Sequence, residues 1–304
     1  MYKSVEQWAE IADIEEKGNV WFTEYQTNDL GISFRIRAVL ESKKTPFQLL
    51  TVIDTYEFGK IMLLDNAVMV SDREEFLYHE YLAHIPMSAH PAPKDILVIG
   101  GGDGGTVREI LKHPSVESVK LVEIDREVVE AARKYFPDLS YGLDDSRVEI
   151  LYTDGIKFVQ SAKNKFDIIL VDSTDPRGPA VGLFSPQFYK DAHKALKEGG
   201  ILSAQTESPV LHPTIFEEIY SSLAKAFGAG NLWTYLGWTP LYPSGMWSFC
   251  FAGKNSHPLK NFDANRATQM SQITQWFNSE VHKAAFAAPN YIKDLLPEGT
   301  EQKE

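Results

Sequence analysis

The stretch Ile96-Leu97-Val98-Ile99-Gly100-Gly101-Gly102-Asp103-Gly104-Gly105 decides the fold class of this chain. Four apolar residues are followed by the pattern Gly-x-Gly-x-x-Gly, and then by a helix-like segment over residues 106–112. This order predicts a tight turn between a strand and a helix, in which the backbone can closely approach a nucleotide.

Asp103 is the unusual residue of this loop. Helix N-termini and clustered backbone N–H groups attract anions, so a carboxylate inside the loop works against binding of a pyrophosphate. It favours instead a cofactor that carries positive charge.

Composition and charge narrow the class of protein. With 304 residues, of which 43% are hydrophobic, the chain can bury a large core in one or two domains. Its single cysteine, Cys250, excludes an internal disulfide framework and a cysteine-rich metal site, which fits the reducing cytoplasm. The net charge of −12 disfavours nucleic acid and anionic membranes as partners, and no apolar run is long enough to cross a bilayer.

The pattern of apolar residues predicts an α/β fold with a β-rich start. Alternation of strands and helices after residue 94 indicates a mostly parallel sheet with helices on both faces. The expected strands are 34–40, 47–55, 60–64, 95–100, 118–124, 147–152, 166–172, 200–205, 231–238 and 246–253, and the expected helices are 74–89, 104–112, 126–135, 155–162, 185–197 and 212–227. We therefore expect an N-terminal β-rich domain over residues 1–72 and a catalytic domain over residues 73–304.

Acidic residues follow four of the expected parallel strands. They are Asp103 in the glycine loop, Glu123, Asp154, and the pair Asp172 and Asp175. Ligands of such sheets bind outside the carboxyl ends of the strands, where an acid after the second strand can hydrogen-bond a ribose diol. One such acid is commonly a helix cap, but four at one edge predict a binding cleft.

Two interpretations of this cleft differ in the cofactor. A nicotinamide dehydrogenase explains the glycine loop and Glu123 but leaves the other carboxylates beside a pyrophosphate unexplained. A nucleoside without phosphates explains all of them, with the ribose on Glu123 and the adenine near Asp154. S-Adenosylmethionine carries a carboxylate that Asp103 would repel, whereas its decarboxylated form ends in an ammonium that Asp103 would attract by about a few kcal/mol.

The chain resembles the spermidine synthase (polyamine aminopropyltransferase) family, and looks most like its bacterial members. The resemblance runs from Trp21-Phe22-Thr23-Glu24 to about Lys293. It rests on Phe47-Gln48, Leu63-Leu64-Asp65, Glu75-Phe76-Leu77-Tyr78-His79-Glu80, Gly100 to Gly105, Val122 to Asp125, Asp154-Gly155, Asp172 to Pro176, Gly178-Pro179-Ala180 and Leu241-Tyr242-Pro243-Ser244-Gly245.

The resemblance implies a fold, an oligomer and a set of site residues. The fold is a Rossmann-like, methyltransferase-type sheet with a small N-terminal antiparallel β domain, a C-terminal helical extension, and assembly into homodimers or homotetramers through the N-terminal part. Positions matching those that hold the nucleoside are Gln48, Gly100, Gly102, Glu123, Asp154, Gly155 and Pro179, and Asp103 matches the residue that binds the aminopropyl amine. Positions matching the acceptor channel are Tyr78, His79, Asp172, Ser173, Thr174, Asp175 and Tyr242, and residues 173–183 match a loop that closes over the ligands.

The implied reaction is transfer of an aminopropyl group from decarboxylated S-adenosylmethionine, a co-substrate, to putrescine. Methylthioadenosine leaves as a neutral thioether, so we expect no metal and no tightly bound cofactor. The attacking amine has a pKa of roughly 10 and must lose a proton. We expect Asp172, oriented by Tyr78, to accept that proton.

The acceptor and the reaction type leave alternatives open. One segment where family members vary is Thr206-Glu207-Ser208-Pro209-Val210-Leu211, which we expect to border the far end of the acceptor channel and to set its length together with Tyr242 and Asp175. Arg177 is another variable position. Putrescine is the favoured acceptor, and both positions leave cadaverine, agmatine or spermidine possible. A putrescine N-methyltransferase is a second hypothesis, which Asp103 disfavours. A polyamine-binding protein without catalytic activity is a third.

Overall fold

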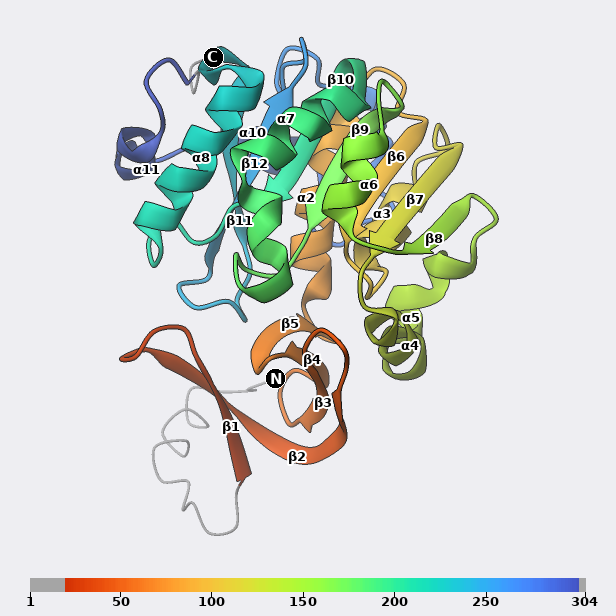
Figure 1. Cartoon of the computed structure of the whole chain (residues 1–304), viewed down its shortest axis with the longest axis vertical. Coiled ribbons are helices and arrows are strands. Elements are labelled where there is room, and N and C mark those ends of the chain that lie inside the picture. The colour runs from red at the N-terminus through yellow and green to blue at the C-terminus, as the bar shows by residue number, and fades with distance from the viewer. Residues whose placement is uncertain (1–19, 301–304) are drawn as a thin grey trace.

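The computed structural model describes residues 20–300, which form two β-sheets (Figure 1). The small sheet is antiparallel, in the order β1(Val20–Tyr25), β2(Gly31–Lys44), β3(Leu49–Thr55), β4(Lys60–Leu64) and β5(Ala67–Ser71). The large sheet has the order β11(Leu232–Trp238), β12(Met246–Gly253), β10(Leu196–Gln205), β9(Phe166–Asp172), β6(Asp95–Gly100), β7(Ser118–Glu123) and β8(Val148–Tyr152). The α/β class with a small antiparallel N-terminal sheet is therefore as predicted; residues 1–19 and 301–304 of the two expected domains lie outside the described residues.

The strand order of the large sheet positions the cleft. Strands β6 to β10 pair in parallel, whereas β12 runs antiparallel to both of its neighbours. The chain proceeds from β6 to β7 on one side, while β9 lies on the other side of β6, so the order reverses between β6 and β9. Loops that follow the two strands diverge at such a point and leave a crevice beyond the carboxyl ends.

Helices cover both faces of the large sheet, because its central strands are apolar on both sides. On one face, α2(Glu75–Ala89), α3(Gly105–Leu111), α9(Ala264–Met270) and α10(Ser279–Ala285) contribute to a core that includes Ile96 and Val98. On the other face, α6(Gly155–Ser161), α7(Pro186–Ala195), α8(Pro213–Phe227) and α11(Asn290–Leu295) pack over Leu97 and Ile99. Figure 1 shows α6, α7 and α8 in front of the sheet and α2 and α3 behind it.

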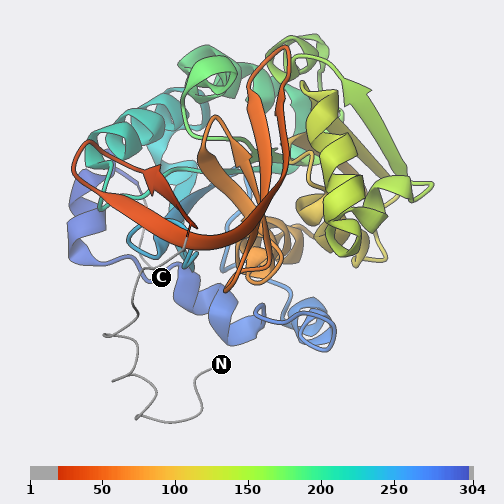
Figure 2. The ribbon, with the colours of Figure 1, turned by 90° about the horizontal axis from the view of Figure 1, so that it is seen from below.

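The small sheet lies at the carboxyl edge of the large one. Leu50, Val52 and Met62 pack against Val128 and Ala132 of α4(Arg126–Tyr135), which α5(Pro137–Ser140) and the 3₁₀ helix η1(Tyr141–Asp144) follow. Seen from below in Figure 2, the long strand β2 crosses beneath the large sheet. This apolar contact fixes the small sheet over the strand ends.

Three of the expected elements have bounds that differ from the observed ones by more than two residues or by element type. Strand 200–205 is too short, because β10 begins at Leu196. Strand 34–40 is too short, because β2 runs from residue 31 to 44 and shifts register between Val39 and Glu41. Such bulges interrupt the alternation on which a strand is recognised in the sequence. Helix 185–197 is too long, because Leu196 already pairs with Phe166 at the start of β10.

Other elements have no counterpart among the expected ones. The edge strands β1 and β5 have only six and five residues. Two 3₁₀ helices, η2(Gly178–Phe184) and η3(Ala229–Asn231), also fall in segments without a predicted element. Among the described residues, no helix is both long and apolar enough to cross a membrane.

The Glu80 carboxylate joins α2 to the C-terminal part of the chain. It is almost fully buried and accepts backbone N–H groups of Gln275 (2.8 Å), Trp276 (2.8 Å) and Phe277 (2.7 Å). Helix α2 itself is buried from Leu77 to Ala89. One carboxylate thus holds the residues between α9 and α10 against the helix.

Replacing this carboxylate should destabilise the whole domain. Glu80→Ala leaves three buried N–H groups without acceptors, and we expect it to lower the free energy of unfolding by about 3 kcal/mol or more. Urea denaturation followed by circular dichroism measures the change, with Glu218→Ala on the exposed surface of α8 as the control that stays within about 0.5 kcal/mol. A loss below about 1 kcal/mol for Glu80→Ala would contradict this role.

Candidate active site

Two connected cavities lie between the small sheet and the carboxyl edge of the large sheet. Their volumes are about 140 Å³ and about 30 Å³, so the first can take a much bulkier group than the second. Five residues line both of them, namely Met69, Tyr78, Ser173, Thr174 and Tyr242. Ligands in the two cavities would therefore meet at these residues.

The structure brings the predicted site residues together. The larger cavity is lined by Gln48, Tyr78, His79, Gly100, Gly102, Asp103, Glu123, Asp154, Gly155, Asp172, Ser173, Thr174, Pro179 and Tyr242. Asp175 lines the smaller cavity instead. The remaining walls of the larger cavity are mainly apolar, with Phe47, Met62, Ile99, Val122 and Leu183 among them.

The glycine loop makes room for Asp172 as well as for a ligand. Gly100 and Gly101 both have positive φ angles, of 76° and 69°. A Cβ on Gly100 would lie 2.2 Å from the backbone oxygen of Asp172, and one on Gly101 would lie 2.7 Å from its Oδ2. Glycine is required at both positions, because the end of β9 packs directly against the loop.

Asp172 is a buried carboxyl group with a raised pKa. Burial, and then the negative charge of Asp103, raises the pKa of Asp172 to about 6. The positive charge of His79 and two hydroxyls lower this pKa: Thr106 donates to Oδ2 at 2.6 Å, and Tyr78 also hydrogen-bonds the carboxylate. A carboxyl group in this condition can exchange a proton near neutral pH.

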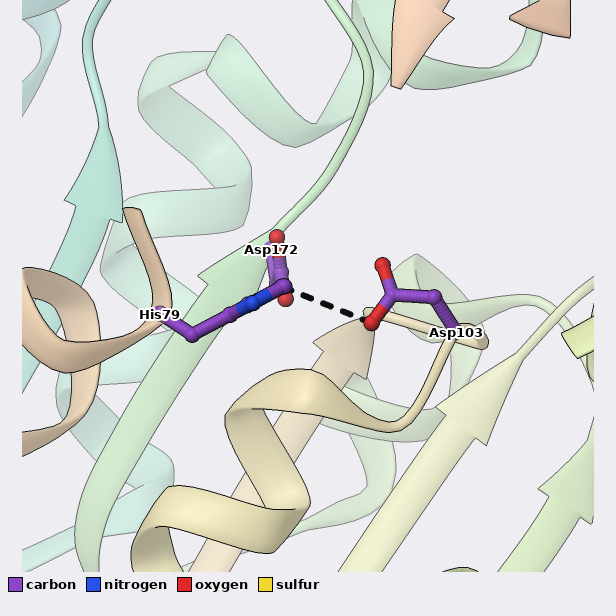
Figure 3. Close-up of side chains that lie close together, drawn as sticks. All are labelled: His79, Asp103 and Asp172. Atoms are coloured by element: carbon purple, nitrogen blue, oxygen red, sulfur yellow. Dashed lines mark ion pairs between the residues drawn. The ribbon is translucent and has the colours of Figure 1, made fainter. Parts of the chain in front are cut away.

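Asp103 and His79 form an ion pair at the N-terminus of α3 (Figure 3). The Asp103 Oδ1 atom lies 3.4 Å from His79 Nε2 and accepts the Gly105 N–H at 2.7 Å. Burial opposes ionisation of Asp103, but His79 and the Gly105 N–H together hold its pKa below the ordinary value. Burial likewise opposes protonation of His79, yet Asp103 and Glu75 raise its pKa well above the ordinary value.

His79, Asp103 and Asp172 come from three different elements but form one cluster. One ligand atom of each lies within 4.8 Å of the others, a spacing that could hold a metal ion. The spacing of these three residues in the sequence matches no metal-binding pattern, so their clustering could not be predicted from that spacing. The carboxylates of Asp103 and Asp172 can instead hold an ammonium group, while the protonated His79 pairs with Asp103.

A second group of acids lies where a nucleoside would bind. Burial raises the pKa of Glu123 to about 7, and its Oε1 accepts the Asp125 N–H at 2.8 Å. The Asp125 carboxylate in turn accepts the amide of Gln48 at 3.0 Å. Asp154 lines the cavity and also caps α6, because its Oδ1 accepts the Ile156 N–H at 2.8 Å. The capping and ligand-binding interpretations of Asp154 are thus compatible.

The smaller cavity contains a third group of acids. Tyr242 donates its hydroxyl to the Met69 carbonyl at 2.9 Å, and Glu24 and Asp175 lie in the cavity wall. Burial raises the pKa of Glu24 to about 7. Glu207 lies beside Asp175, and burial followed by that neighbouring charge raises its pKa to about 9. Glu207 Oε1 is buried without a hydrogen-bond partner, on a backbone with φ of 68°.

The segment that was expected to be a loop over residues 173–183 is only partly irregular. Its second half forms η2, from which Pro179, Ala180 and Leu183 face the larger cavity. Gly178 begins this turn with φ of 52° and Pro179 follows at an early helical position. These two residues were visible in the sequence as a helix start, but the segment was too short to be recognised.

Four residues in or behind the walls of the site were not predicted. Glu75 precedes His79 by four positions on α2, so their contact was detectable from helical spacing. Thr106 directly follows the glycine loop, which was a weaker signal. Glu24 and Arg108 reach the site only through tertiary packing, so sequence spacing could not place them. Glu207 belongs to the segment 206–211 that was expected to border the acceptor channel, and it lies beside Asp175.

Comparison with known proteins agrees with this geometry. The family described as Spermine/spermidine synthase domain matches residues 75–264, and that described as Spermidine synthase tetramerisation domain matches residues 20–72. The chain is 47% identical to the polyamine aminopropyltransferase of Caldicellulosiruptor bescii over 277 residues, covering 91% of this chain and 98% of that protein. It is 44% identical to the enzyme of the same name from Methanocaldococcus jannaschii over 287 residues, covering 94% and 98%.

Solved structures show the same likeness. A spermidine synthase in complex with the transition-state analogue AdoDATO has a TM-score of 0.88 and 43% identity, covering 91% of this chain and 94% of that one. The spermidine synthase of Thermotoga maritima has a TM-score of 0.85 and 42% identity over the same shares of both chains. The predicted family and its methyltransferase-like fold are thereby confirmed: this chain belongs to the spermidine synthase family.

Proposed function

We propose that this protein transfers the aminopropyl group of decarboxylated S-adenosylmethionine to putrescine, giving spermidine and methylthioadenosine. The observation that carries the proposal is the charge of the two cavities. Asp103, Glu123, Asp154 and Asp172 face the larger one, and neither cavity is lined by a lysine or arginine from the described part of the chain. A doubly charged sulfonium donor and a diamine fit such a site, because both are cations.

The donor is assigned to the larger cavity. Glu123 would hold the ribose, and the region of Asp154 and Gly155 would hold the adenine. The aminopropyl chain would then cross the glycine loop and bring its ammonium to Asp103. Intact S-adenosylmethionine would place a carboxylate in the same region, where Asp103 repels it.

The acceptor is assigned to the smaller cavity. Its reacting nitrogen would lie near Tyr78, which lines both cavities, and would face Asp172 in the wall of the larger one. Its distal ammonium would lie between Asp175 and Glu24, with Glu207 behind Asp175. Putrescine carries an ammonium at each end and so matches both groups of acids.

The reaction then follows from the position of these groups. The neutral amine attacks the carbon next to the sulfonium, the new C–N bond forms as the C–S bond breaks, and the electron pair remains on the sulfur. Methylthioadenosine leaves uncharged, so the leaving group needs no acid and no Lewis acid. Asp172 takes the proton of the attacking nitrogen, and alignment of two bound reactants in a buried cavity supplies most of the acceleration.

The N-terminal sheet is the proposed site of self-association. Val20, Trp21, Tyr25, Val39 and Tyr56 are at least 49% exposed on or beside β1 and β2. Exposed apolar surface of this kind is typical of an interface, and the matching family is described as a tetramerisation domain. We propose a homodimer or homotetramer in the cytoplasm, where the buried thiol of Cys250 stays reduced.

Product analysis tests the proposed reaction. The purified protein should convert putrescine and the decarboxylated donor to spermidine and methylthioadenosine, and should be far less active with intact S-adenosylmethionine. Butylamine, which lacks the distal ammonium, should show both a lower kcat and a higher KM. Formation of N-methylputrescine from the intact donor would indicate a methyltransferase, and binding without product would indicate a binding protein. A better rate with spermidine, cadaverine or agmatine would overturn only the choice of acceptor.

Asp172 should control the acidic side of the pH–rate profile. Because its pKa is raised to about 6 and its carboxylate form is the base, kcat should fall as the pH drops through that region; bound cations would move this limb lower. Asp172→Asn should reduce kcat by roughly 10²–10⁴-fold with methylthioadenosine affinity nearly unchanged.

Thr106→Val is the matched variant for this experiment. It removes the hydroxyl that stabilises the carboxylate, so the acidic limb should move up by about one pH unit while kcat at high pH is retained. Equal losses of nucleoside affinity and rate in Asp172→Asn, or an unmoved limb in Thr106→Val, would show that Asp172 is not the base.

A further inference from the structure

A chain of buried charged groups leads away from the candidate active site behind His79. The His79 Nδ1 atom lies 2.7 Å from Glu75 Oε2, and Arg108 binds both oxygens of Glu75, at 2.8 and 2.9 Å. Arg108 Nε also donates to Glu109 at 2.8 Å, and Glu109 contacts His84 at 2.9 Å. Glu75, Arg108 and Glu109 line neither cavity, so they can act on a ligand only indirectly, through the position of His79 or, for Arg108, also through its charge near Asp103.

The residues around His79 hold its imidazole ring in a single position. The side chains of Glu75 and Arg108 are only 10% exposed, and that of His79 is 3% exposed. A Cβ on Gly105 would lie 2.3–2.6 Å from three ring atoms, so the ring packs directly on the first turn of α3. Both ring nitrogens face carboxylates, which requires a proton on each.

This position of His79 in turn fixes Asp103. Its Oδ1 atom is held by His79 and by the Gly105 N–H. Figure 3 shows the other carboxylate oxygen pointing away from His79. If the imidazole ring turned or moved, Asp103 could rotate and lose the orientation in which one oxygen is free for a ligand.

We propose that Glu75 and Arg108 are positioning residues for the donor. They hold the His79 ring so that Asp103 keeps one oxygen directed to the aminopropyl ammonium. This inference rests on the proposed function, because it assigns the donor's ammonium to Asp103. It predicts that loss of these residues weakens binding of the donor's ammonium group and leaves binding of its nucleoside part unchanged.

The test compares the donor with methylthioadenosine, which has the same nucleoside but no ammonium. Glu75→Gln should raise the KM for the decarboxylated donor by about tenfold, while the inhibition constant of methylthioadenosine stays within about twofold. Gly105→Ala moves the same ring without removing a charge and should give the same selective change. Gly230→Ala, which adds a methyl group into open space, is its control.

Glu109→Gln shows whether a loss of stability alone changes donor binding in the same way as a displaced His79 ring. It disturbs the buried network three contacts beyond His79 and should lower the thermal midpoint without changing the ratio of the donor KM to the methylthioadenosine inhibition constant. The inference fails if this ratio is unchanged in both Glu75→Gln and Gly105→Ala, or if Glu109→Gln changes it as much. Should Glu75→Gln not fold, Gly105→Ala alone decides. Failure of the proposed function would differ, because the wild-type protein would then give no spermidine.

Discussion

The structure depends on the burial of several carboxyl groups at one edge of a parallel sheet. Parallel strands end at the same side, so the acids that follow them converge there. Closure by the small sheet removes these acids, and Glu24 of β1, from water, which raises the pKa of Asp172, Glu123 and Glu24. Without a ligand, these carboxyl groups have few positively charged partners. A bound cation reduces the repulsion between them and replaces the interactions with water that burial removed.

Many of the protein's own partners for buried charged groups lie on α2. This helix passes through the core, so each of its charged groups needs a buried partner. Glu75 pairs with His79 and Arg108, and Glu80 accepts three backbone N–H groups of the C-terminal part. His79 is the cationic member of the pocket wall, and it forms an ion pair with one oxygen of Asp103 at 3.4 Å. The remaining negative charge is left for ligands.

Much of the fold and of the site was predictable, because both follow from patterns local in the sequence. Strand 95–100, the glycine loop and the acids after each strand are all visible in short windows, and strand order then brings them together. The long strand β2 was not predictable in full, since its bulges break the alternation. Glu24 was missed because folding, not spacing, brings it close to Asp175. Glu207 was expected near the acceptor channel only as part of the segment 206–211, and its contact with Asp175 follows from the fold. The role of each site residue stays a prediction until it is measured.

The most direct test of cation recognition by buried carboxyl groups is the number of protons released when putrescine binds. Calorimetric titration of putrescine into the protein saturated with methylthioadenosine, near pH 7.5 in buffers of different ionisation enthalpy, measures this number. Because the pKa of Glu207 is raised to about 9, this group is protonated beforehand, and the arriving ammonium should lower its pKa and release its proton. A proton lost from the amine itself would also be released when putrescine binds the Glu207→Gln variant. The wild-type protein loses the Glu207 proton in addition, so it should release more protons than the variant. Equal release by both proteins, or binding heats that do not depend on the buffer, would contradict the account.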